Sequence, residues 1–280
     1  MKYFCKLIFV SILVFFFTIK SKAQNIAAVE QQLTLLSTIF LNKDTAQTTR
    51  DSASNLFYTE LKKILQKPES YAYSFDKLNT ISILQPDDKA LKIFTWHTYS
   101  DSGTYHFWGL VQIPAARKRK HQLVELVDKG KNTISKKSMY TSLEEKNWYA
   151  CQYYSIVAKK YKKQKYYVLL GINWATPTLN TKVIDALVID EQGVYFGVPT
   201  FQEEGDNAKY RVVFQYAESA AMLLKYDKSA DAIVFDRLQP IHPVYENNYN
   251  YYVPSFIYDG YFFQDGVWVM HSDIDIRNPK

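Results

Sequence analysis

Two histidines on either side of a short acidic turn are the residues best suited to binding a metal ion. His97 and His106 flank Asp101-Ser102-Gly103, a sequence typical of a hairpin turn. If the three side chains met across that hairpin, His97, Asp101 and His106 would suit zinc or a similar ion. Histidines on the strands of a tyrosine-rich sheet usually serve as cross-strand packing partners instead. We therefore expect no resident metal and no other cofactor.

Four carboxylates are candidates for acid–base chemistry. Asp236 ends an apolar run, Asp259 and Asp265 belong to two nearby Asp-Gly steps, and Glu218 lies between two strand-like segments. A pair of carboxylates about 5–10 Å apart in an aromatic cleft would be able to hydrolyse a glycosidic bond. Asp-Gly steps also form tight turns, so a purely structural role for these aspartates is the alternative to a catalytic one.

The motifs of several common enzyme classes are missing. The sequence contains no G-x-S-x-G, no glycine-rich phosphate loop, no H-E-x-x-H and no C-x-x-C. Cys151 is a single thiol in the strand-like run WYACQYYSIV, where flanking tyrosines favour a buried structural cysteine over a nucleophile. Whether the protein is an enzyme stays open, and the missing motifs favour a non-enzymatic role.

Basic residues gather in one part of the chain. The segment Arg117–Lys165 carries 14 basic and 4 acidic residues, a net charge of +10. The excess is concentrated in two expected hairpin loops, Arg117-Lys118-Arg119-Lys120 and Lys159–Lys165. Solvated loops would explain both clusters, but if they lie together they would attract an anionic surface such as lipid headgroups or an acidic polysaccharide.

Two helices are expected before the β-rich part that positions these residues. Apolar residues recur at steps of three and four from Ile26 to Phe40, which places them on one helical face. A second helix is expected over Ser52–Gln66, capped by Asp51 or Ser52 and followed by Pro68.

From about Ile81 onward, short runs of β-branched and aromatic residues separated by turn sequences predict strands. No long helix fits between any two of them, so the sheet is expected to be largely antiparallel. The expected strands are Leu91–Thr98, Tyr105–Ile113, His121–Val127, Trp148–Ala158, Tyr166–Asn173, Lys182–Ile189, Val194–Val198, Tyr210–Tyr216, Ala220–Tyr226, Ala232–Phe235, Tyr258–Phe263 and Val267–His271.

The predicted fold class is α+β, mainly β. Two N-terminal helices precede a long antiparallel β meander that forms a curved or barrel-like sheet. The expected organisation is a signal peptide over residues 1–23, a helical segment over 24–80 packed on the sheet, and an antiparallel β domain over 81–280.

The first residues read as a cleavable secretory signal. A positively charged start precedes the uncharged run Leu7–Ile19, and small residues Ser21 and Ala23 precede a cut between Ala23 and Gln24. The run is 13 residues long, too short for the roughly 20 that span a bilayer as a helix. No later stretch is long and apolar enough to do so. We expect a protein exported to the periplasm or secreted, with no transmembrane segment after cleavage.

Cleavage also changes the charge. The chain has 34 basic and 28 acidic residues, and four of the lysines leave with the signal, so 30 remain against 28, a net charge of +2. The high isoelectric point therefore does not argue for binding to nucleic acid. Tyrosine remains abundant, and its flat apolar face with a polar tip suits stacking on sugars or on partner surfaces as well as half-buried strand positions.

Seven segments through most of the mature chain, taken together and in order, carry a resemblance to a known family. They are SFDKLNTISIL, DDKALKIFTWHT, YYVLLGINW, KVIDALVIDEQGVYFGVPTF, RVVFQYAESAAMLLKYD, IVFDRLQP and YDGYFFQDGVWV. These segments resemble an uncharacterised family of exported proteins of Bacteroidetes-type bacteria, for which no activity is assigned. The resemblance implies export and fold rather than an activity. The chain differs from the usual family pattern at His97, where an acidic or amide residue is usual, and at Asn173-Trp174, where a tryptophan-aspartate pair is usual.

Two functions remain after this comparison. The first is a non-enzymatic envelope or secreted protein that binds an envelope polymer, a lipid surface or another exported protein. The second is a carboxylate-dependent hydrolase of envelope or extracellular glycans. Converging carboxylates in an aromatic cleft would favour the hydrolase, and an aromatic or basic surface without them would favour binding.

Overall fold

The structure is a computed structural model that describes residues 25–116, 119–129, 136–176, 178–190 and 193–275. The expected signal peptide with its Ala23–Gln24 cut, and also Arg117 and Lys118, lie outside these residues. The chain divides into two compact units. One contains the residues up to Ile81 together with Pro114–Leu123, and the other contains Ser82–Ile113 and Val124–Lys280. No helix within the described ranges is both long and apolar enough to cross a membrane.

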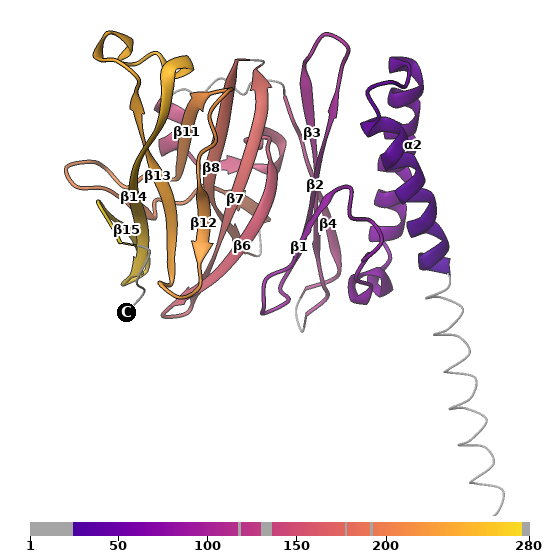
Figure 1. The fold of residues 1–280 in the computed structure, drawn as a ribbon. Coiled ribbons are helices and arrows are strands. Elements are labelled where there is room, and N and C mark those ends of the chain that lie inside the picture. The colour runs from indigo at the N-terminus through magenta and orange to yellow at the C-terminus, as the bar shows by residue number, and fades with distance from the viewer. Residues whose placement is uncertain (1–24, 117–118, 130–135, 177, 191–192, 276–280) are drawn as a thin grey trace, which may run out of the picture. The chain divides into compact units, whose positions relative to one another are not determined.

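The first unit contains the two expected helices. The first helix covers residues 25–41 and buries Ile26, Leu33, Leu36 and Phe40, which confirms the predicted face. The second, α2 (Gln47–Leu65), lies beside the first (Figure 1) and buries its apolar side. Phe40 of the first helix packs edge-on against Phe57 of α2, with ring centroids 5.2 Å apart.

The start of α2 differs from the prediction. The helix begins five residues before Ser52, and Ala46 precedes it without a side-chain cap. The predicted caps, Asp51 and Ser52, are therefore helical residues. Arg50 is buried in the first turn and donates hydrogen bonds to the carbonyl oxygens of Lys43 and Thr45, both at 3.1 Å. These bonds tie the helix start to the turn before it.

A buried glutamate fixes the segment that follows α2. After the short 3₁₀ helix η1 (Pro68–Ala72), the Tyr73 hydroxyl and the Lys77 backbone N–H each donate to the Glu30 carboxylate at 2.7 Å. Glu30 is only 1% exposed, so it needs both donors. Burial and the bond to Glu30 raise the pKa of Tyr73 from 10 to about 12.

Three sheets build the second unit, except that the first two residues of one strand, Gln122 and Leu123, are counted with the first unit. The four-stranded sheet has the order β1 (Ser82–Leu84), β2 (Lys92–Tyr99), β3 (Tyr105–Ile113) and β4 (Gln122–Leu126). The six-stranded sheet has the order β5 (Leu143–Glu144), β9 (Val194–Phe196), β8 (Leu179–Ile189), β7 (Gln164–Thr176) and β6 (Gln152–Tyr161), with β11 (Arg211–Ala217) also paired to β8. The five-stranded sheet has the order β10 (Phe201–Gln202), β15 (Val267–His271), β14 (Tyr252–Gln264), β13 (Ala232–Pro240) and β12 (Leu224–Asp227).

The pairing confirms the expected antiparallel character, and the short pair β10–β15 is parallel. The strands do not form one continuous meander or a barrel-like ring, because the described strands fall into three separate sheets with free ends. Short 3₁₀ helices connect some of them: η2 (Lys136–Tyr140), η3 (Glu145–Asn147), η4 (Pro243–Tyr245) and η5 (Tyr249–Tyr251). Whether the helical segment packs on the sheet stays a prediction.

The six-stranded sheet is the middle layer of this unit (Figure 1). Successive residues of a strand point to opposite faces. On β7, Tyr167 and Leu169 join a core with the four-stranded sheet, whereas Val168 and Leu170 join a core with the five-stranded sheet. Burial on both faces explains why this strand reads as the unbroken apolar run YYVLLGI in the sequence.

A large bulge interrupts the pairing of β13 with β14. Asp236 pairs with Tyr258 and Leu238 with Pro254, so the three residues Ser255–Ile257 lie opposite the single residue Arg237. Phe256, at the centre of the bulge, has a φ of 64° and is 90% exposed. Beyond the bulge both strands continue to a tip that holds η4 and η5.

Candidate functional site

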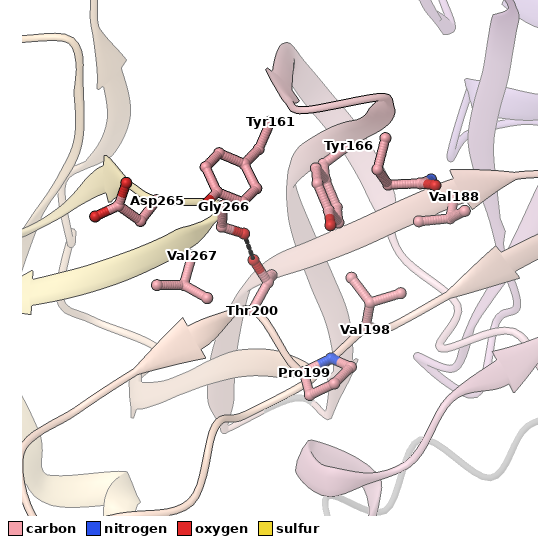
Figure 2. Close-up of a pocket in the computed structure, with 10 residues that line it drawn as sticks. Tyr161, Tyr166, Val188, Val198, Pro199, Thr200, Asp265, Gly266 and Val267 are labelled. Atoms are coloured by element: carbon pink, nitrogen blue, oxygen red, sulfur yellow. Dashed lines mark hydrogen bonds between the residues drawn. The ribbon is translucent and has the colours of Figure 1, made fainter.

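A pocket of about 500 Å³ opens in the second unit, where the middle sheet meets the five-stranded sheet (Figure 2). Its volume falls within the range of small-molecule sites. The β6–β7 hairpin and the end of β8 form one wall, and the residues before β10 and the β14–β15 turn form the other. The lining residues are Tyr161, Gln164, Tyr166, Val188, Val198, Pro199, Thr200, Asp265, Gly266 and Val267.

The β6–β7 hairpin supplies both aromatic rings. Tyr161 pairs with Gln164 across the two-residue turn Lys162-Lys163, and Lys162 has a φ of 53°. Tyr166 follows on β7, and both rings lie at the pocket in Figure 2. The Lys162 ammonium lies 5.0 Å from the centroid of the Tyr161 ring, within the range of a cation–π contact. The turn therefore brings a positive charge to the aromatic wall.

The β14–β15 turn fixes the Tyr161 ring. Asp265 and Gly266 both have positive φ, 48° and 93°. A Cβ atom at Gly266 would lie 2.5 Å from Cδ1 of Tyr161, so only glycine lets the ring pack on this backbone. Thr200 Oγ1 donates to the Gly266 carbonyl at 3.4 Å, the bond drawn in Figure 2. The backbone N–H of Trp268 donates to the Thr200 carbonyl at 2.7 Å. This bond joins β15 to the residues before β10, the two segments of the second wall.

The lysines of β6 have different environments. Lys159 pairs with the Asp231 carboxylate, and its ammonium lies 5.7 Å from the centroid of the Trp268 ring. Its side chain is only 16% exposed, so its charge serves the ion pair with Asp231 rather than ligand binding. Lys162 and Lys163, by contrast, are exposed at the turn. Of these two, Lys162 places its ammonium over the Tyr161 ring of the pocket wall.

Comparison with protein families, with curated proteins and with solved structures found no match to this chain. The resemblance to an exported family therefore stays a prediction, and the site is interpreted from its own chemistry.

The two candidate metal-binding histidines do not face each other. On the β2–β3 ladder His97 pairs with Phe107 and His106 pairs with Thr98, and neighbouring positions of a strand point to opposite faces. His97 hydrogen-bonds with Gln152 at 2.8 Å and packs against Trp174, with ring centroids 5.0 Å apart. Asp101 lies at the exposed turn, and no cluster of three or more metal-ligating side chains occurs in the described ranges.

The four candidate carboxylates have separate surroundings. Asp236 is 8% exposed and accepts a hydrogen bond from the Leu223 N–H at 2.6 Å. Asp259 is 5% exposed and forms a two-pronged ion pair with Arg237, with N···O distances of 2.5 and 2.9 Å. Of the two exposed carboxylates, Asp265 lines the pocket described above and Glu218 lines a different one. A catalytic pair in one pocket is thus not formed by these four residues.

A buried ionic network that the sequence did not indicate lies in the middle sheet. Arg211 on β11 and Asp185 on β8 are cross-strand partners, both side chains are 0% exposed, and Nε lies 3.3 Å from the carboxylate. Arg211 also donates to the carbonyl oxygens of Ser138, Thr141 and Phe196. The network fixes the segment before β5 and the end of β9.

Cys151 is buried beside this network, as predicted. Burial raises the pKa of its thiol, followed by the repulsion from Asp185. A thiol held neutral and away from solvent is a poor nucleophile. Its place in the core explains the tyrosines and alanine that flank it.

The basic loops lie in different units. Arg119 and Lys120 belong to the first unit, and Lys159–Lys165 to the second. Contact of Arg117-Lys118-Arg119-Lys120 with an anionic surface stays a prediction. The sequence missed the pocket residues Tyr161, Tyr166 and Thr200, because no local pattern joins segments that are about 35 to 100 residues apart in the chain.

Proposed function

We propose that the chain is an exported, non-enzymatic protein that binds an acidic polysaccharide of the cell envelope or of the surrounding medium. Export to the periplasm or beyond is supported by the charged start, the apolar run Leu7–Ile19 and the small residues before Gln24. The resemblance to exported proteins of Bacteroidetes-type bacteria supports the same location.

The observation that carries the proposal is the pocket with two tyrosine rings, one of which lies under the ammonium of the exposed Lys162. A sugar ring offers an apolar C–H face that packs on an aromatic ring, and hydroxyl groups that pair with short polar side chains. Tyr161 and Tyr166 provide the rings, and Gln164 provides an exposed amide. Asp265 adds an exposed carboxylate, and this negative charge is accompanied by the positive charge of Lys162 over the Tyr161 ring. Lys162 and Lys163 add attraction for a negatively charged chain.

Charge favours a polysaccharide over a lipid surface as the ligand. Membrane-binding segments usually present about 4–8 lysines or arginines on one face. At this pocket two lysines are exposed at the turn, while Lys159 and Lys165 pair with Asp231 and Asp88. A uronic acid unit, with one carboxylate and several hydroxyls, matches this balance of charge and polarity.

The alternative is a glycan hydrolase that uses Glu218, Asp236, Asp259 or Asp265. The separate environments of these carboxylates favour binding over hydrolysis. Binding and hydrolysis predict different fates for the same oligosaccharide, so one experiment separates them.

The test uses the mature chain, Gln24–Lys280, and tetragalacturonate as the acidic probe. Calorimetric titration is expected to show binding that weakens with added salt, and chromatography is expected to show an intact probe after long incubation. Lys162→Gln with Lys163→Gln should weaken binding, whereas Lys160→Gln is the matched control, because Lys160 points to the opposite face of β6 from Tyr161. Binding only to phosphatidylglycerol vesicles, or cleavage of the probe, would overturn the proposal.

A further inference from the structure

A second pocket lies at the tip of the β13–β14 hairpin, within the same unit. Its volume is about 500 Å³, and three segments distant in the sequence form it. They are the β7–β8 turn, the end of β11 and the hairpin tip. The lining residues are Thr178, Ala217, Glu218, Ser219, Asn248, Asn250 and Tyr251.

Polar side chains dominate this pocket, unlike the first. Two amides, three hydroxyls and one carboxylate line it, and together these groups both donate and accept hydrogen bonds. The Glu218 and Ser219 side chains are exposed, whereas the Glu218 backbone is held in place. The Glu218 N–H donates to the Thr178 carbonyl at 3.3 Å, and Asn180 donates to the Glu218 carbonyl at 3.1 Å. The Glu218 backbone is thus fixed at the pocket, while its side chain is exposed.

Contacts within the hairpin tip fix the position of Tyr251. Tyr251 stacks on Tyr245 with a centroid distance of 4.0 Å and an interplanar angle of 16°. The Ile241 N–H donates to the Tyr251 carbonyl at 3.0 Å, and the Asn247 N–H donates to the Tyr252 hydroxyl at 3.1 Å. Tyr251 is still 39% exposed, so part of its surface is open to a ligand. A preorganised aromatic ring loses little entropy on binding.

We propose that this pocket binds a neutral saccharide. The Tyr251 ring would pack on the apolar face of one sugar unit, while Asn248, Asn250 and Glu218 bind its hydroxyl groups. Glu218 is the single charged lining residue, and its negative charge disfavours acidic sugars. The ligand class therefore differs from that proposed for the first pocket, and the two sites stand or fall separately.

The test is calorimetric titration of the mature chain with three neutral probes, cellotetraose, maltotetraose and chitotetraose. At least one probe is expected to bind. Tyr251→Ala and Asn250→Ala should each lower its affinity about tenfold, which corresponds to 1.4 kcal/mol. Tyr251→Phe keeps the ring and should retain binding. Both positions are exposed at the tip, and circular dichroism checks that each variant is folded.

Two further variants separate this site from the first. Tyr161→Ala should leave the affinity for the neutral probe within about twofold of the original, because Tyr161 lines the other pocket. Glu218→Gln should retain the neutral probe and weaken the discrimination against tetragalacturonate. Failure of all three probes to bind, or binding that Tyr251→Ala does not change, would overturn this inference without bearing on the acidic site.

Discussion

Replacing Asp185 with asparagine tests the importance of the buried ion pair in the middle sheet. The substitution keeps the shape of the side chain but removes the charge that faces Arg211 at 3.3 Å. At that distance and an effective dielectric constant of about 20, the attraction is about 5 kcal/mol. Removing one partner of a buried pair typically costs about 3–5 kcal/mol, because the other charge is left without its counterion. We expect Asp185→Asn to lower the free energy of unfolding by about that amount.

Urea unfolding followed by tryptophan fluorescence measures this loss. All five tryptophans lie in the unit that contains Asp185, so the signal reports on that unit. The free energy of unfolding of a protein of this size falls by roughly 2–3 kcal/mol per molar urea, so the urea concentration at the unfolding midpoint should fall by about 1–2 M. Asp227→Asn is the matched control, since its partner Lys225 is 46% exposed and such a partly solvated pair should contribute at most about 1 kcal/mol. A loss below about 1 kcal/mol for Asp185→Asn would refute the reasoning.

Three further predictions concern single residues. Cys151 in the mature chain should react with a disulfide reagent only on unfolding, because it is buried and its thiol pKa is raised; rapid reaction in the native state would contradict its burial. Phe256→Gly should raise the free energy of unfolding, measured by urea unfolding, by about 1 kcal/mol, because glycine removes the backbone strain of a positive φ and the Phe256 side chain is 90% exposed. A lower free energy of unfolding would instead show that the Phe256 ring contributes to packing. Tyr73 has a pKa raised from 10 to about 12, so its contribution to stability is full below pH 10 and declines toward pH 12. The stability difference between the original chain and Tyr73→Phe, followed by circular dichroism, should therefore narrow over that range, and a constant difference would exclude this linkage.

The sequence predicted those parts of the fold that local patterns determine. The helical face from Ile26 to Phe40 and the antiparallel strands follow from period and turn residues, and both are confirmed. The predicted start of α2 at Ser52 was wrong, because Arg50, rather than a capping side chain, ties the helix to the preceding turn. The division into three sheets was missed because strand neighbours depend on contacts between distant segments.

The candidate sites show the same limit. His97 and His106 have the spacing of a metal site across a hairpin, but a difference of one residue in register places them on opposite faces. Asp259 was selected for its Asp-Gly step, and its ion pair with Arg237 comes from the neighbouring strand β13, which no turn sequence indicated. Tyr161 became a pocket residue only because Gly266, about 100 positions later, leaves room for its ring.

The most direct test of the proposed function is equilibrium binding of tetragalacturonate to the mature chain and to Tyr161→Ala. The substitution removes the ring that packs on Gly266 and lines the pocket, without removing a charge. The proposal predicts binding to the original chain and an affinity at least about tenfold lower for the folded variant. Equal affinities for the two proteins, or no binding to either, would contradict it.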